Sequence, residues 1–224
     1  MTKKAKKKTV KRLATKPAIA GLYAITPDLA DTNELLRKVR LALQGGARVL
    51  QYRNKTADAA LQLQQAQALR RLTLEFDTTF IVNDDAALAA QVDADGVHLG
   101  GEDGSVAASR ALLGATKFIG VSCYNRAPLA LAAVQQGANY VAFGAFFPSS
   151  VKPEAVKAEV SMLREARHEI HVPIVAIGGI SQQNGGELIE AGADSLAVIS
   201  ALWDAPDIEA SAKGFSTLFS RTQQ

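Results

Sequence analysis

Eight short apolar runs alternate with eight helical patterns along most of the chain, and this alternation constrains the fold more than any other feature. Runs of strand length are expected at residues 21–26, 48–53, 79–84, 96–100, 118–123, 140–144, 173–178 and 195–201. Helical patterns are expected at 33–44, 57–76, 86–91, 105–113, 127–136, 154–169, 182–191 and 207–219. Strict alternation indicates a parallel sheet, and eight pairs in about 200 residues predict an α/β fold of the (β/α)₈ TIM-barrel type. A doubly wound open sheet remains the alternative, because alternation does not prove closure.

Basic residues are concentrated at the N-terminus of the 224-residue chain. Residues 1–12 contain seven Lys or Arg residues and no acidic residue, which leaves 18 basic against 22 acidic residues and a net charge of −4 over the rest. We expect residues 1–16 to form a disordered basic arm and residues 17–224 to form a single catalytic barrel domain. A protein that binds nucleic acid through the arm is the alternative from another functional class, although we expect no nucleic-acid partner.

The cysteine count and the hydropathy pattern limit the cellular compartments in which we expect the protein. The only cysteine is Cys123, which excludes an intramolecular disulfide and a cysteine-based zinc site. The basic arm lacks the apolar stretch of a signal peptide, and no apolar run approaches the roughly 18 residues of a membrane span. We therefore expect a cytoplasmic protein without a membrane partner. Hydrophobic residues make up 48% of the chain, as in ordinary globular proteins, which excludes disorder throughout.

Acidic residues follow two neighbouring apolar runs. The third run ends at Asp84, and the fourth leads into a loop that ends at Asp103. In a parallel sheet the two carboxylates would lie at the same edge, where they suit Mg²⁺ bound together with substrate phosphates. The alternative is that these acids cap helices or lie in solvated turns.

Cationic side chains follow the second run. Strand alternation places Gln51 and Arg53 on one face, and Lys55 continues the same register. A guanidinium fork and an ammonium group together suit a diphosphate. The alternative is a strand end with solvated cations.

A second anion site is expected after the last three runs. The sixth run leads into Ser149, Ser150, Val151 and Lys152, whose hydroxyls, backbone N–H groups and ammonium suit a phosphate monoester. Gly179 and Ser200 follow the seventh and eighth runs, where barrels commonly bind phosphate. Two anion sites at one end of a barrel predict two phosphorylated small-molecule substrates.

Other polar residues have less specific interpretations. Ser122 ends the fifth run, where its hydroxyl would lie near the same mouth or cap the next helix. His98 lies within the fourth run and is interpreted as a barrel or core residue rather than a catalytic one. His168 and His171 are expected at the opposite end of the barrel.

The motifs at the ends of the runs together resemble thiamine-phosphate synthase, over residues 21–219. They are YAITP (23–27), QYRNK (51–55), VNDD (82–85), GVHLGGED (96–103), GVSCYN (120–125), FGAFFPSSVK (143–152), AIGGI (176–180) and AVISAL (197–202). The resemblance implies that the protein joins 4-amino-2-methyl-5-hydroxymethylpyrimidine diphosphate to thiazole phosphate, which gives thiamine monophosphate and releases diphosphate.

The resemblance also implies roles for individual residues. Residues implied to hold the pyrimidine diphosphate are Gln51, Tyr52, Arg53, Asn54, Lys55, Asn83 and Ser122, and those implied to hold the thiazole phosphate are Ser149, Ser150, Val151, Lys152, Gly179, Ile199 and Ser200. Asp84 and Asp103 would bind Mg²⁺. Arg53, Lys55, Ser122 and Lys152 are the implied catalytic residues. The leaving diphosphate would be neutralised by Mg²⁺ and the cations, and the thiazole nitrogen would capture the pyrimidinylmethyl cation without a general base.

Two positions depart from the family pattern. The family usually has Thr where Val151 stands and Gln where Gly101 stands, so we expect weaker binding of the thiazole phosphate rather than loss of activity. A thiazole tautomerase of the same barrel family is the alternative, although it would not need the pyrimidine-diphosphate residues found here. The sequence leaves open whether the chain forms a homo-oligomer.

Overall fold

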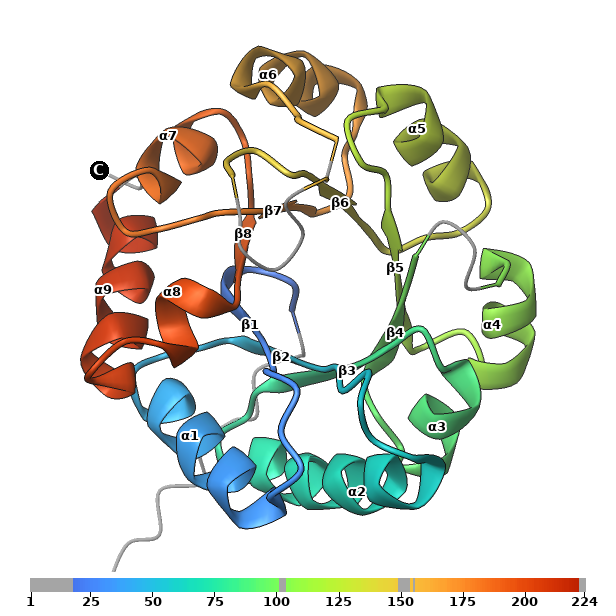
Figure 1. Ribbon diagram of the computed structural model, residues 1–224. Helices are drawn as coiled ribbons and strands as arrows, with labels where there is room; N and C mark the ends of the chain where they lie inside the picture. The colour runs from blue at the N-terminus through green and yellow to red at the C-terminus, as the bar shows by residue number, and fades with distance from the viewer. Residues whose placement is uncertain (1–17, 101–103, 149–153, 155, 222–224) are drawn as a thin grey trace, which may run out of the picture.

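Eight parallel strands close into a barrel in the computed structural model, which describes residues 18–100, 104–148, 154 and 156–221. Each strand pairs with the next along the chain, and β8 pairs with β1 to complete the ring seen in Figure 1. The strands are β1 (Gly21–Ile25), β2 (Val49–Tyr52), β3 (Thr79–Asn83), β4 (Gly96–Leu99), β5 (Phe118–Ser122), β6 (Tyr140–Phe143), β7 (Ile174–Ile177) and β8 (Ser195–Val198). Closure confirms the TIM-barrel prediction and rules out the open sheet.

Helices surround the strands on the outside of the ring (Figure 1). They are α1 (Thr32–Gln44), α2 (Ala59–Glu75), α3 (Ala86–Gln91), α4 (Val106–Leu113), α5 (Ala127–Gln135), α6 (Val160–Glu169), α7 (Gly185–Glu190), α8 (Ser200–Trp203) and α9 (Ile208–Arg221). Several begin at a side chain that accepts a backbone N–H, as Asp31 does for α1 and Ser105 for α4. None of the helices described is long and apolar enough to cross a bilayer.

Strand alternation divides the core into two parts. Leu22 and Ala24 on β1 point outward and join the large apolar layer between the sheet and the helices. Tyr23 and Ile25 point inward and join a smaller cluster inside the ring, together with Tyr140 from β6. Burial of both faces explains why the strands read as nearly continuous apolar runs.

Most expected boundaries differ from the structure by one to three residues, and two differences have a clear cause. The helix expected at 154–169 begins only at Val160, because residues 156–158 are held in another way: Ala145 N–H donates to Val156 O at 3.0 Å and Ala158 N–H donates to Ala145 O at 2.8 Å. The strand expected at 195–201 ends at Val198, and the short helix α8 follows it. The Trp203 indole N–H anchors α8 by donating to Ile25 O at 2.5 Å. The expected basic arm, residues 1–16, lies outside the described residues.

Candidate active site

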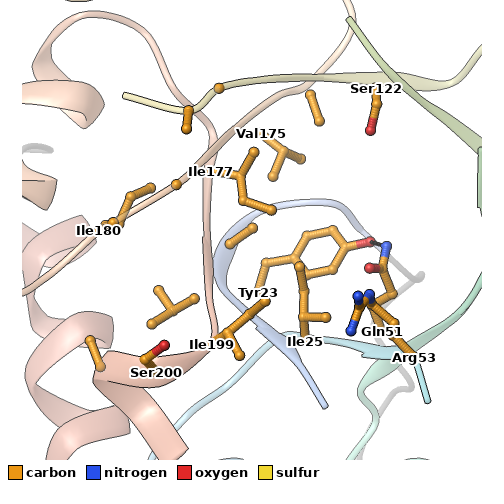
Figure 2. Close-up of a pocket in the computed structure, with 18 of the residues that line it drawn as sticks. Tyr23, Ile25, Gln51, Arg53, Ser122, Val175, Ile177, Ile180, Ile199 and Ser200 are labelled. Carbon is orange, nitrogen blue, oxygen red and sulfur yellow. Dashed lines mark hydrogen bonds between the residues drawn. The ribbon is translucent and has the colours of Figure 1, made fainter. Parts of the chain in front are cut away.

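A cavity of about 550 Å³ opens at the carboxyl ends of the strands. Ile25 at the end of β1, Ser122 at the end of β5 and Ile177 at the end of β7 all line it. Figure 2 shows Arg53 on one side of this cavity and Ser200 on the other, with apolar side chains of the barrel interior between them. A cavity with polar ends and an apolar middle suits flat heterocycles that carry phosphate groups.

Strand alternation sets the direction of the side chains at the end of β2 and directly after it. Gln51 and Arg53 point into the cavity, as expected. Tyr52 and Asn54 instead lie behind the barrel wall, where both bond the Gln65 amide oxygen of α2, at 2.9 Å from the Tyr52 hydroxyl and 3.0 Å from Asn54 Nδ2. Burial raises the pKa of the Tyr52 hydroxyl above its ordinary value. These bonds tie the β2 loop to its helix, and both residues also line the smaller cavity described below.

Arg53 is held by residues that follow β1. Its backbone N–H donates to the Thr26 hydroxyl at 2.8 Å, and that hydroxyl donates back to Arg53 O at 2.8 Å. Its guanidinium pairs with Asp28 at 3.3 Å, and the same carboxylate accepts the Lys55 backbone N–H at 2.9 Å. Sequence reasoning missed Asp28, although its place directly after the YAITP motif is a signal for a loop that touches the neighbouring strand end.

A smaller cavity of about 150 Å³ lies next to the first and shares Arg53 and Asn83 with it. Lys55 and Asp84 also line it, and Lys55 Nζ lies 4.0 Å from the Asp84 carboxylate. Asp84 has a left-handed backbone with φ of 62°, and its N–H donates to His98 O of β4 at 2.8 Å. The predicted metal carboxylate and one predicted diphosphate cation are thus neighbours.

The donor chemistry around Asp84 fits Mg²⁺. Its carboxylate is partly exposed beside the Asn83 amide, and hard oxygen donors of this kind suit Mg²⁺, which often uses only one or two carboxylates plus phosphate and water. The described residues contain no group of three or more His, Cys, Asp or Glu that would hold a metal by protein ligands alone. Asp103, the second expected ligand, lies outside the described residues.

Glycines shape the opposite side of the main cavity. Gly178 and Gly179 have φ of 102° and 60°, and a Cβ at Gly179 would clash with Pro148 O. The loops after β6 and β7 therefore pack closely, and Phe147 N–H donates to Gly178 O at 3.0 Å.

Three predicted residues on this side line the main cavity: Gly179, Ile199 and Ser200. They come from the loops after β7 and β8. The other four predicted phosphate residues, Ser149, Ser150, Val151 and Lys152, lie outside the described residues.

A buried polar chain crosses the bottom of the cavity and was missed by sequence reasoning. The Tyr23 and Tyr140 hydroxyls lie 3.0 Å apart, and His98 Nδ1 lies 3.1 Å from Tyr140 and Nε2 2.9 Å from Ser122 Oγ. Burial raises the pKa of both tyrosines above the ordinary value. His98 is a buried barrel residue, as interpreted, and it also lines the cavity. Tyr23 and Ile25 are two residues apart on one strand and so face the same side, which was the signal in the sequence that Tyr23 points into the barrel.

Cys123 follows Ser122 but is not placed for chemistry. Its side chain is buried, and burial raises the pKa of the thiol to about 12, so it stays protonated near neutral pH. This agrees with the absence of a nucleophile motif around it in the sequence.

The fold and these residues can be compared with known proteins. A family model described as thiamine monophosphate synthase matches residues 22–202. A thiamine-phosphate synthase of Methylobacillus flagellatus is 55% identical over 91% of this chain and 97% of its own length, and one of Nitrosospira multiformis is 50% identical over 95% and 92%. The solved structure of a thiamine phosphate pyrophosphorylase from Pyrococcus furiosus superimposes with a TM-score of 0.82 at 34% identity, over 92% of this chain and 98% of that one. The protein is therefore a transferase that belongs to the thiamine monophosphate synthase family.

Proposed function

We propose that this protein is a thiamine-phosphate synthase. It joins 4-amino-2-methyl-5-hydroxymethylpyrimidine diphosphate to thiazole phosphate and releases thiamine monophosphate and diphosphate. The observation that carries the proposal is the arrangement of the main cavity, which has Gln51 and Arg53 at one side, and Gly179 and Ser200 at the other. Two candidate anion sites with an apolar space between them suit two phosphorylated heterocycles.

The reaction replaces one bond by another at a single carbon. The C–O bond between the pyrimidinylmethyl carbon and the diphosphate breaks, and its electron pair leaves with the diphosphate. The resulting pyrimidinylmethyl cation accepts the lone pair of the thiazole nitrogen, which forms the new C–N bond. That nitrogen carries no proton, so the step needs no general base, which is consistent with a protonated Cys123 thiol and a His98 bonded to other side chains.

Arg53 and Lys55 would act on the leaving diphosphate. Arg53 is held by Asp28 and Thr26 at the rim of the cavity, so its guanidinium is positioned before the diphosphate arrives. Lys55 adds a second positive charge from the adjoining small cavity. Charge that is fixed in place favours the transition state, in which negative charge builds up on the diphosphate.

Mg²⁺ would be held by Asp84 and Asp103, with Asn83 beside Asp84. When bound, the ion would offset part of the charge of the diphosphate. On the opposite side, Ser149, Ser150, Val151, Lys152, Gly179, Ile199 and Ser200 would hold the thiazole phosphate. The apolar side chains of the barrel interior would exclude water from the cation before the nitrogen captures it.

One assay tests the proposal. The purified protein is incubated with both phosphorylated heterocycles and Mg²⁺, and thiamine monophosphate is measured by the fluorescence of its oxidised product. We expect product formation, and we expect Arg53→Ala to lower kcat/KM by roughly 10²-fold or more because a charge-stabilising group is lost. The absence of product with both the native chain and Val151→Thr would contradict the synthase and favour the thiazole tautomerase.

A further inference from the structure

Five polar side chains form one continuous hydrogen-bonded chain inside the barrel, and the proposed chemistry leaves three of them unexplained. The order is Gln51, Tyr23, Tyr140, His98 and Ser122. Gln51 Nε2 donates to the Tyr23 hydroxyl at 2.9 Å, and the remaining three links measure 3.0, 3.1 and 2.9 Å. The chain runs from β2 through β1, β6 and β4 to β5, and it ends at a hydroxyl that lines the main cavity.

The position of the Tyr140 ring depends on the absence of a side chain at Gly120 in the neighbouring strand. Gly120 pairs with Tyr140 across β5 and β6, and a Cβ on Gly120 would clash with the tyrosine ring. The ring therefore lies over β5 and reaches His98 on β4, whose ring is 5.5 Å away between centroids. A buried tyrosine hydroxyl needs hydrogen-bond partners in any case, but here those partners connect it through His98 to Ser122 at the cavity.

The direction of the hydrogen bonds follows from the charge at one end. Arg53 lies two residues after Gln51 on the same inward face, and its positive charge favours the Gln51 amide oxygen toward it and the amide N–H₂ away from it. That amide donates to Tyr23, as the structure has it and as the dashed line in Figure 2 marks. Burial raises the pKa of both Tyr23 and Tyr140, so each keeps its proton.

Only one arrangement then gives the protons of both buried tyrosines an acceptor within the chain. Tyr23 accepts from Gln51 and donates to Tyr140, and Tyr140 donates to Nδ1 of His98. If Tyr140 instead donated to Tyr23, the Tyr23 proton would have no acceptor among these partners. With Nδ1 as an acceptor, His98 carries its proton on Nε2 and donates it to Ser122 Oγ. The Ser122 proton is then directed elsewhere.

We propose that Tyr140 is a positioning residue that acts through His98 and sets the Ser122 hydroxyl as a hydrogen-bond donor toward the cavity. A group that faces Ser122 in the cavity is then an acceptor. In the pyrimidine substrate a ring nitrogen has this character, whereas the exocyclic amine is a donor. The identity of that ligand rests on the proposed function, but the proton arrangement of the free protein does not.

Nitrogen NMR of the ligand-free protein tests the proton arrangement directly. The chain has three histidines, and His168 and His171 are exposed on α6 and the turn after it, so His168→Gln and His171→Gln assign the His98 signals. With ¹⁵N-labelled histidine, we expect His98 to show a protonated Nε2 and an unprotonated Nδ1. A proton on Nδ1, or on both nitrogens, would overturn the proposal. Removal of the donor by Tyr140→Phe is expected to shift the Nδ1 signal, and an unchanged Nδ1 signal would also overturn it.

Kinetics test the consequence for the substrate. Tyr140→Phe is expected to raise KM for the pyrimidine diphosphate by roughly three- to tenfold, as for one weakened hydrogen bond, and to leave KM for the thiazole phosphate unchanged. Thr73→Val is the matched control, because it also removes a buried hydroxyl, but one that bonds Arg70 O within α2. We expect it to change neither KM.

The outcomes separate the inference from the function on which it rests. A folded Tyr140→Phe protein with both KM values unchanged would contradict the positioning role. A raised KM for both substrates would indicate general disruption and would contradict it as well. If the native protein made no thiamine monophosphate, the proposed function would fail, while the NMR result would still decide the proton arrangement.

Discussion

Asp84 and Asp85 are adjacent residues whose carboxylates have different surroundings. Asp84 has the left-handed backbone with φ of 62° and lies beside Lys55 at the small cavity. Asp85 has an extended backbone and accepts the Leu88 N–H at 2.8 Å, which caps α3. Asp85 is therefore a helix cap, whereas Asp84 lies at the small cavity, where metal binding is predicted.

This difference gives a prediction for a matched pair of variants. Asp84→Asn removes a negative charge from the proposed Mg²⁺ site, so we expect a loss of several kcal/mol of transition-state stabilisation, or roughly 10²- to 10³-fold in turnover. Asp85→Asn makes the same chemical change one residue later and keeps an oxygen that can cap α3, so we expect turnover close to that of the native protein. Steady-state rates measured over a range of Mg²⁺ concentrations compare the two. Native turnover by Asp84→Asn would rule out the metal assignment.

Single residues also show where prediction from sequence stopped. Gln51, Arg53 and Ser122 were placed correctly at the cavity because strand parity fixes the direction of a side chain. Asp28 and the hydroxyls of Tyr23 and Tyr140 were not found. The partners of these residues come from other strands, and the two tyrosines are 117 positions apart, so no local pattern records their contact.

At the scale of elements, the loops after β6 and β7 touch through the backbone at Gly179. Any side chain there would both occupy a left-handed conformation and clash with Pro148 O. The loop that follows Pro148 contains the predicted phosphate residues. The glycine therefore determines how closely Pro148 can approach the loop after β7.

Gly179→Ala tests this element. We expect it to raise KM for the thiazole phosphate by roughly tenfold or more, because the loops must separate, while KM for the pyrimidine diphosphate changes less. Gly137→Ala is the control: its φ is 97°, so an alanine is strained there too, but a Cβ there meets no atom within 4 Å. Urea unfolding measures the stability of both variants. Equal KM values for the two variants would contradict a role of the Gly179 contact in binding.

The order of strands and helices followed from sequence, but the late start of one helix and the early end of one strand did not. Alternation of apolar runs with helical patterns predicted every strand of the ring. The late start of α6 and the short helix α8 depend on backbone bonds to Ala145 and on the Trp203 indole bond to Ile25 O. Such bonds form only when distant loops meet, so residue preferences near Glu154 or Ser200 do not reveal them.

The charge of the whole molecule is divided between the arm and the body. The first 12 residues of the expected arm (1–16) carry seven cations, while residues 13–224 have a net charge of −4. The residues proposed to act on the substrates all lie in the body. Removal of residues 2–12 is therefore expected to leave kcat and both KM values unchanged, as measured in the fluorescence assay. Loss of activity on truncation would instead favour a function that depends on the arm, such as nucleic-acid binding.

The buried tyrosines predict how stability depends on pH. Burial raises the pKa of Tyr23 and Tyr140 in the folded protein above the ordinary value of 10.0. Above pH 10 the unfolded chain loses these protons more readily than the folded chain does, so the free energy of unfolding falls as the pH rises. Below pH 10 the contribution is fully present. We expect urea midpoints to stay level from these groups up to pH 10 and to fall as the pH rises above it, and to fall less in Tyr140→Phe.

The seam between β8 and β1 has a consequence for biosynthesis. Ser195 Oγ donates to Gly21 O at 2.7 Å and Trp203 donates to Ile25 O, so the end of the barrel sequence is fastened to its beginning. The last strand also brings Ile199 and Ser200 to the cavity. A nascent polypeptide would therefore lack the complete cavity, and with it activity, until β8 has left the ribosome and paired with β1.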